Sequence, residues 1–205
     1  MARSYSDESQ SLCHRVFRWA AGTLSWIGIL FANSVHGDGM TPMEAMSAGG
    51  EVPSFYVRAV TGPQAGKSVC YVCRNGDRPV VMVLLKELGP DATALLKELD
   101  RSVNRHRADG LRCFAVYLTD TPQKDSARLQ TLAFDEKIDV PLTLAGEAAT
   151  QGSSVAVPVG ATISVITYYD RRVVQRFSYK PGTCDETARR SIISASEKLI
   201  ESSMQ

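Results

Sequence analysis

Two cysteines, Cys70 and Cys73, are the residues of this sequence whose type and spacing most directly offer chemistry. Two thiols separated by two residues can close a reducible disulfide, and one thiol can then resolve a mixed disulfide formed on the other. The same pair could instead form a structural disulfide, remain as two buried apolar thiols, or supply half of a zinc site. The spacing therefore leaves structural, redox and metal-binding roles open.

The other candidate residues offer little support for a metal or hydrolytic site. Zinc would need two further ligands, and after residue 37 only carboxylates and the side chains of His106, Cys113 and Cys184 remain. His106 is the single histidine there, which leaves almost nothing for Ser-His or Cys-His catalysis. The glycines form no nucleotide-binding motif. We therefore expect no metal and no other cofactor.

The remaining cysteines and the histidine have ordinary structural interpretations. Cys113 lies inside an apolar run, so we expect it in the core. Cys184 stands at the start of a predicted helix beside Asp185; the helix favours a thiolate and the carboxylate opposes it, which indicates at most a modestly reactive thiol. His106 lies near a helix end, where a cation is stabilised by the helix dipole, so a solvated cation is favoured over a catalytic role.

The elements that must position these residues are organised around residues 79–103. Residues 80–85 are an unbroken apolar run, typical of a strand buried on both faces of a sheet. Pro90 suits the first helical position and Asp91 the first turn, and apolar residues then recur at helical spacing as far as Val103. A buried strand that leads directly into a helix is half of a βαβ unit.

The rest of the chain supplies strands and helices around this unit. The patterns predict the order β-β-β-α-β-α-β-β-β-α. The predicted segments other than residues 79–103 are strands at 52–60, 68–73, 111–118 and 140–144, a helix at 125–137, a connection at 146–160, a hairpin of 163–168 with 173–179, and a last helix from a Thr183–Glu186 capping box to about Glu201.

The first 37 residues have the pattern of an export signal. Arginines precede a 13-residue apolar stretch, 20–32, and small residues at Ala32-Asn33-Ser34 fit a cleavage site. Thirteen residues are short for a membrane span, yet an uncleaved anchor at 18–34 and an amphipathic terminal helix remain open. We expect a flexible lead-in at 38–50, one domain at 51–203, and a periplasmic or extracellular location, with membrane contact only if the signal is retained.

Charge and composition exclude one class of partner. The net charge is +1, and no basic stripe with interleaved aromatic residues is present, so we expect no nucleic-acid binding. The partner that remains is another protein, reached through thiol–disulfide exchange or a surface contact.

The order of elements resembles the thioredoxin superfamily, over about residues 51–200, and looks most similar to its exported redoxin-like branch of peroxiredoxins and thiol–disulfide oxidoreductases. Three stretches carry the resemblance: 52–55 (VPSF), Gly66-Lys67 followed by 79–81 (PVV), and 139–142 (DVPL). The resemblance implies a three-layer α/β/α fold with a central mixed sheet and a C-terminal ββα unit.

The sequence departs from that family at the usual active site. Thioredoxins carry Cys-Gly-Pro-Cys where the central strand meets the helix, because the helix N-terminus stabilises a thiolate. This chain has Leu88-Gly89-Pro90-Asp91 there, which the resemblance marks as a vestigial turn whose usual cysteines are missing. Cys70 and Cys73 precede the central strand, at the end of the sheet away from that turn, and we expect no helix directly after them.

Two functions of different classes follow. The first is a non-catalytic binding or structural module in an extracytoplasmic compartment, favoured by the missing cysteines. The second is a thiol–disulfide oxidoreductase that uses Cys70 and Cys73 in a displaced position, favoured by the resemblance.

Overall fold

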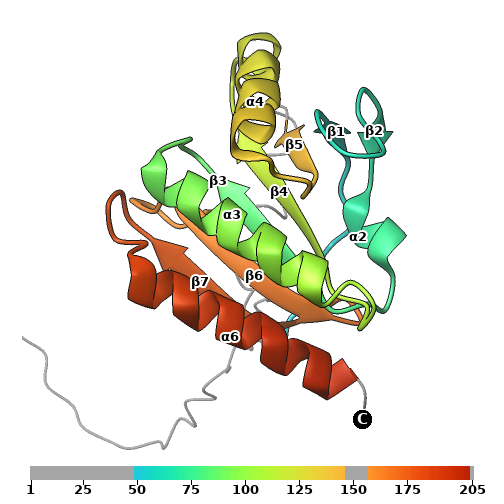
Figure 1. Cartoon of the computed structure of the whole chain (residues 1–205). Coiled ribbons are helices and arrows are strands. Elements are labelled where there is room, and N and C mark those ends of the chain that lie inside the picture. Colours follow the sequence, from blue (N-terminus) through green and yellow to red (C-terminus); the bar gives the residue numbers. More distant parts are fainter. Residues whose placement is uncertain (1–48, 146–156, 204–205) are drawn as a thin grey trace, which may run out of the picture. The chain divides into compact units, whose positions relative to one another are not determined.

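The described part of the protein, residues 49–145 and 157–203 of a computed structural model, is built on one mixed sheet (Figure 1). Its strand order is β2-β1-β5-β4-β3-β6-β7. The strands are β1 (Val57–Ala59), β2 (Ser68–Val69), β3 (Val80–Leu85), β4 (Arg112–Leu118), β5 (Leu142–Ala145), β6 (Ile163–Tyr169) and β7 (Arg172–Tyr179). The helices are α2 (Tyr71–Asn75), α3 (Pro90–Arg105), α4 (Pro122–Glu136) and α6 (Glu186–Ser203).

The predicted central strand is β3. All six of its residues are buried, at most 1% exposed. It pairs in parallel with β4 and antiparallel with β6, so both of its edges are covered as well as both of its faces. A run without polar residues fits this position because no side chain of β3 reaches water.

Helices lie on both faces of the sheet. On one face Leu95 of α3, Leu129 of α4 and Ile192 of α6 belong to one hydrophobic cluster with the inward residues of β3, β4 and β5. On the other face Val72 of α2 joins a second cluster with Val52 and the alternate residues of the same strands. The predicted three-layer α/β/α fold, with a mixed sheet and a C-terminal ββα unit, is confirmed.

The start of α3 follows the predicted pattern. Gly89 is the N-cap residue, Pro90 occupies the first turn without loss of a hydrogen bond, and Asp91 places a carboxylate near the positive end of the helix dipole. The apolar residues at helical spacing, such as Leu95, Leu96 and Leu99, are fully buried. The β3–α3 unit predicted for residues 79–103 therefore forms as expected.

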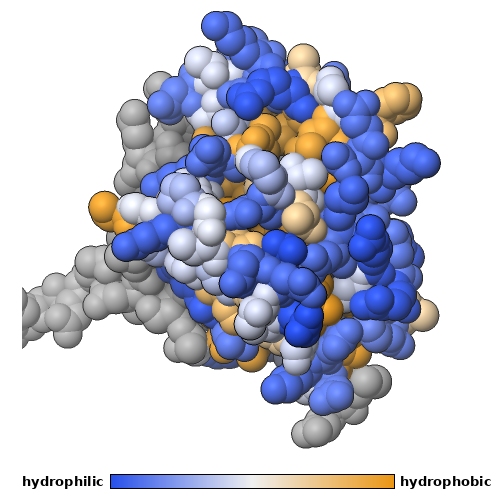
Figure 2. Space-filling model, turned by 60° about the vertical axis from the view of Figure 1, so that its left-hand side comes forward, coloured by the Kyte–Doolittle hydropathy of each residue, from blue (hydrophilic) through white to orange (hydrophobic). Residues whose placement is uncertain are grey.

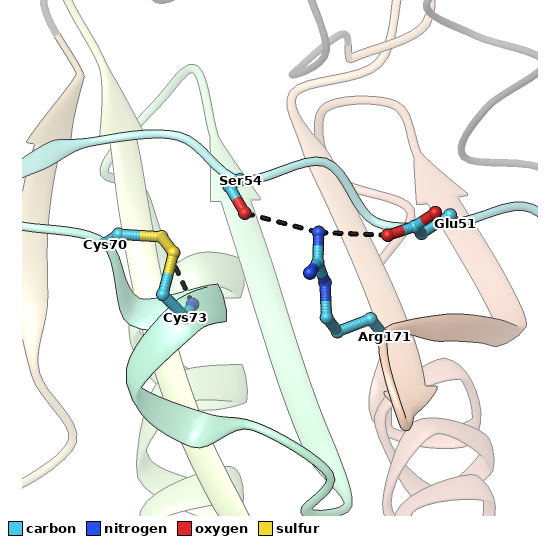
Figure 3. Close-up of a disulfide and its surroundings, with 5 residues drawn as sticks. All are labelled: Glu51, Ser54, Cys70, Cys73 and Arg171. Carbon is cyan, nitrogen blue, oxygen red and sulfur yellow. Dashed lines mark hydrogen bonds and ion pairs between the residues drawn. A yellow bond between two sulfur atoms is a disulfide. The ribbon is translucent and has the colours of Figure 1, made fainter.

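The β6–β7 hairpin also forms as predicted, and its turn anchors the start of the domain. Asp170 and Arg171 adopt positive φ values of 48° and 60°, which a two-residue hairpin turn requires. The Arg171 guanidinium lies 2.9 Å from the carboxylate of Glu51 and donates to the Ser54 hydroxyl at 3.3 Å (Figure 3). These contacts connect the turn to the segment that precedes β1.

Two predicted strands are shorter than expected. The strand predicted at 52–60 is limited to Val57–Ala59, because the chain before it pairs elsewhere: Glu51 forms an isolated antiparallel bridge with Arg172 at the start of β7, and Arg171 of the β6–β7 turn contacts Glu51 and Ser54. The strand predicted at 68–73 ends after Val69, where the backbone turns into α2.

The predicted capping box of the last helix is wrong. The Thr183 hydroxyl donates backward to the Lys180 carbonyl, and the Asp185 carboxylate accepts from the backbone N–H of Ala188 at 2.8 Å. Asp185 is therefore the cap, because it stands three residues before that N–H and a carboxylate is as good an N-cap as a hydroxyl.

Some predicted segments lie outside the described residues: the signal segment at 1–37, nearly all of the lead-in at 38–50, and most of the connection at 146–160. Gly49 and Gly50, the last residues of the lead-in, hydrogen bond with Val173 at 2.8 Å. Among the helices of the described ranges, none has the length and apolarity needed to cross a bilayer.

Candidate functional site: a Cys-x-x-Cys disulfide at the start of a short helix

Cys70 and Cys73 form a disulfide, with their Cα atoms 5.3 Å apart. Cys70 is the extended N-cap residue of α2, and Cys73 lies in the first turn of that helix. One turn of helix brings residues i and i+3 onto the same side, which places the two sulfurs within bonding reach. The expectation that no helix directly follows the pair is therefore wrong.

Buried side chains hold α2 in place although it has only five residues. Val72 is fully buried, and the Tyr71 ring stacks on Phe114 with their centroids 5.1 Å apart. Gly76 ends the helix with φ of 55°, and its N–H bonds to the Val72 carbonyl. A helix this short shows no periodicity, but the i,i+3 cysteine spacing before Asn75-Gly76 was a usable signal.

The two cysteine residues differ in exposure. Cys70 is 5% exposed, whereas Cys73 lies on the surface. The backbone N–H of Cys73 donates to the Cys70 sulfur at 3.1 Å (Figure 3). A thiol from solution can therefore reach Cys73, and a thiolate released at Cys70 would keep a backbone hydrogen-bond donor.

The other two cysteines of the described residues are free and buried. Burial raises the pKa of the Cys184 thiol to about 11, with a further contribution from Asp91. Burial also raises the pKa of Cys113, and Asp100 adds to the effect. Both stay protonated near neutral pH. Cys113 is in the core as predicted. Cys184, for which the sequence allowed at most a modestly reactive thiol, is fully buried two positions before α6, which agrees with its ordinary structural interpretation.

The turn at Leu88–Asp91 is a separate place in the fold. It begins α3, and its residues from Gly89 to Asp91 line a hollow of about 230 Å³ together with Thr162 and Ile163. No cysteine lines this hollow. Figure 2 turns this side of the molecule forward and shows patches of apolar surface among hydrophilic side chains.

The remaining candidates take structural positions. His106 is the C-cap residue of α3, and its Nδ1 lies 2.9 Å from the Asp109 carboxylate. This is the helix-end position predicted for it. Within residues 49–145 and 157–203, no group of three or more His, Cys, Asp or Glu side chains is arranged to hold a metal ion.

Comparison with known proteins identifies the fold. No known protein family and no curated protein matches the sequence. The structure is similar to that of a conserved protein from Geobacillus kaustophilus, with a TM-score of 0.61, 18% identity, and coverage of 77% of this chain and 84% of the other.

Two similar structures are secreted thiol–disulfide proteins. One is a secreted thiol-disulfide isomerase from Corynebacterium glutamicum, with a TM-score of 0.56, 13% identity, and coverage of 73% of this chain and 85% of that one. The other is a secreted disulfide oxidoreductase from Mycobacterium tuberculosis, with a TM-score of 0.52, 8% identity, and coverage of 69% and 95%.

The chain has a thioredoxin-like α/β fold. Within it, the expectation that the active-site cysteines are missing is not supported, because the structure contains a Cys-x-x-Cys disulfide at a helix start. The sequence placed this pair correctly before the central strand but missed the helix that carries it.

Proposed function

We propose that this protein is an exported thiol–disulfide oxidoreductase that works through Cys70 and Cys73. One observation carries the proposal: the pair forms a disulfide in which one residue is exposed and the other is buried with a backbone donor on its sulfur. An accessible sulfur accepts attack, and a protected sulfur with a donor makes a good leaving group.

The exchange proceeds in two balanced steps. A substrate thiolate attacks the Cys73 sulfur, the Cys70–Cys73 bond breaks, and Cys70 leaves as a thiolate. A second substrate thiol then loses its proton and attacks the substrate sulfur of the mixed disulfide. The substrate leaves with a new disulfide, two electrons stay on this chain, and Cys70 and Cys73 end as thiols. With a substrate disulfide the same steps run in reverse, Cys73 attacking and Cys70 resolving.

Export is part of this proposal. The pattern of residues 1–37 is that of a signal peptide, and two of the similar structures are of secreted proteins. An oxidising compartment would keep the disulfide formed between substrate encounters.

One observation favours a second candidate, a non-catalytic binding module. The turn that starts α3, where thioredoxins carry their cysteines, has Leu88 and Asp91 at the two positions. In that case the Cys70–Cys73 disulfide would only hold α2 in shape, and its reduction potential would lie below about −300 mV.

The test compares the reactivity of the Cys70→Ser and Cys73→Ser variants of the full-length protein. In an insulin-reduction assay, Cys70→Ser and Cys73→Ser each lower the rate by about 100-fold or more, because each removes one of the two exchange steps. With a small aromatic disulfide, Cys70→Ser accumulates a mixed disulfide on Cys73, detected by mass spectrometry, while Cys73→Ser reacts far more slowly because Cys70 is buried.

The matched control is Cys113→Ala/Cys184→Ala, which removes both buried thiols and keeps the pair. This variant retains insulin reduction, and the potential of its Cys70–Cys73 bridge lies between about −270 and −120 mV. Unchanged insulin reduction in Cys70→Ser and Cys73→Ser, or a potential below about −300 mV, would assign the pair to the structural role instead.

A further inference from the structure

A hollow of about 240 Å³ lies next to α2, on the side of the fold where α3 ends. α2 contributes Tyr71 and Arg74 to its lining, α3 contributes Asp100 and Val103, and β4 begins in it at Arg112. Tyr71 and Arg74 are spaced i,i+3 on α2, so they share a face of this helix. The hollow is therefore lined by α2 and α3, which pack against opposite faces of the sheet.

Four arginines line this hollow: Arg74, Arg78, Arg107 and Arg112. None of them forms an ion pair with a carboxylate of the described part of the chain. Arg78 and Arg107 lower the pKa of Arg112, after the larger effect of its burial, which is the mutual repulsion expected of neighbouring cations. The arginines therefore add positive charge that the described residues leave unneutralised.

The carboxylates on the lining offset only half of this charge. They belong to Asp100 and Asp139. Asp100 is already used as an acceptor, since one oxygen takes the backbone N–H groups of Asp139 and Val140 at 2.8 and 2.9 Å, and the other takes the Asn104 amide at 3.1 Å. Four arginines against two carboxylates leave two positive charges in excess on the lining.

A buried hydroxyl in the same lining lacks a partner. Tyr71 is 7% exposed, and its hydroxyl oxygen has no hydrogen-bond partner among the described residues. A buried hydroxyl without a partner is unfavourable unless something completes its hydrogen bond. The Tyr71 ring stacks on Phe114, and Tyr71 is one of the residues that line the hollow.

We propose that this hollow binds the oxyanion of a small organic molecule. The arginines would supply the charge, the Tyr71 hydroxyl a hydrogen bond, and Val103, Val140 and Pro141 an apolar wall for the rest of the ligand. Two negative charges match four guanidinium groups better than one, so a phosphate ester binds more tightly than a carboxylate.

The test uses isothermal titration calorimetry on the full-length protein with phenyl phosphate, benzoate and neutral benzyl alcohol as probes. Phenyl phosphate binds saturably, benzoate more weakly, and benzyl alcohol not measurably; benzoate binding as tightly as phenyl phosphate would assign the site to a carboxylate. The double variant Arg74→Gln/Arg78→Gln weakens phenyl phosphate binding by about tenfold or more, since each lost charge-assisted hydrogen bond is significant.

Two further variants make the result specific. Tyr71→Phe keeps the stacked ring and weakens phenyl phosphate binding about threefold to tenfold, while the melting temperature of the free protein stays the same or rises. Arg190→Gln on α6 removes the same charge elsewhere and leaves binding unchanged. The proposal is overturned if phenyl phosphate binds no better than benzyl alcohol, or if the Arg74→Gln/Arg78→Gln protein, still folded by circular dichroism, binds it with unchanged affinity.

Discussion

The two ends of α3 carry opposite combinations of sulfur and charge. At its start, this 16-residue helix follows a turn that contains no cysteine, and the nearby Cys184 is buried, with a raised pKa that keeps it protonated. At its end, the Cys70–Cys73 disulfide occupies a five-residue helix, and arginines line the adjacent hollow. The long helix that could stabilise a thiolate thus has no accessible sulfur, and the accessible sulfur lies beside side-chain cations instead.

This contrast shows that the helix start that belongs to the core of the fold and the cysteine pair that offers chemistry can lie in different places. The β3–α3 unit is needed for the core, so its geometry stays regular whatever the side chains of its first turn are. A thiolate can be stabilised by any nearby positive charge or donor, so a dithiol is not restricted to one helix start. The two ends can be tested separately.

The largest effect is expected from the carboxylates of α3. Asp100→Ala leaves the buried N–H of Val140 and that of Asp139 without their acceptor, so we expect the free energy of unfolding to fall by about 3 kcal/mol. Asp91→Ala, at the other end, loses only a favourable dipole interaction, about 0.5 kcal/mol. Urea unfolding followed by circular dichroism measures both, and equal losses would contradict the contrast.

A smaller effect is expected from the disulfide. Reduction, or Cys70→Ser/Cys73→Ser, opens a loop of only four residues, so the free energy of unfolding should fall by no more than about 2 kcal/mol. Denaturant unfolding with and without reductant gives this number, and the double variant should show no difference between the two conditions. A loss of folding on reduction would mean that the bridge is an essential structural element.

The smallest effect is expected from restoring cysteines to the start of α3. Leu88→Cys/Asp91→Cys, in a background of Cys70→Ser/Cys73→Ser, creates Cys-Gly-Pro-Cys there. The helix dipole should lower the pKa of the thiol introduced at position 88 by about one unit, or about 1.4 kcal/mol. The pH dependence of alkylation by iodoacetamide measures this pKa, with Leu88→Ala/Asp91→Ala in the same background as the control for the buried thiols. A midpoint at or above the ordinary thiol value would show that this end can no longer support the chemistry.

Much of the fold could be predicted from local pattern. The apolar run from Val80 to Leu85 is stable as a strand inside a sheet. Gly89-Pro90 before apolar residues at helical spacing is typical of a helix start, with Pro90 at the first helical position. The segment at Glu51–Ser54 was not predictable in this way, because it makes a single bridge to the start of β7 and side-chain contacts with the β6–β7 turn, where its alternation indicates a continuous strand.

The site was only half predictable. Cys70 and Cys73 are visible in the sequence, but α2 depends on tertiary burial of Tyr71 and Val72, which five residues cannot reveal by periodicity. The arginines lie at 74, 78, 107 and 112, in two groups separated by β3 and α3. They meet because β3 and β4 run in parallel, with Val80 beside Arg112. The residues at and just before the start of each strand therefore lie at the same end of the sheet.

The segment from Gly49 to Val52 has a consequence for how the protein behaves at high concentration. Its backbone bonds to Arg171 and Val173 occupy the first part of the free side of β7, and the opposite border of the sheet is the two-residue β2. Open strand borders are where folded sheets join one another into aggregates. With the start of β7 occupied and β2 only two residues long, the stretch at which such growth could begin is narrowed to the later part of β7, residues 174–179.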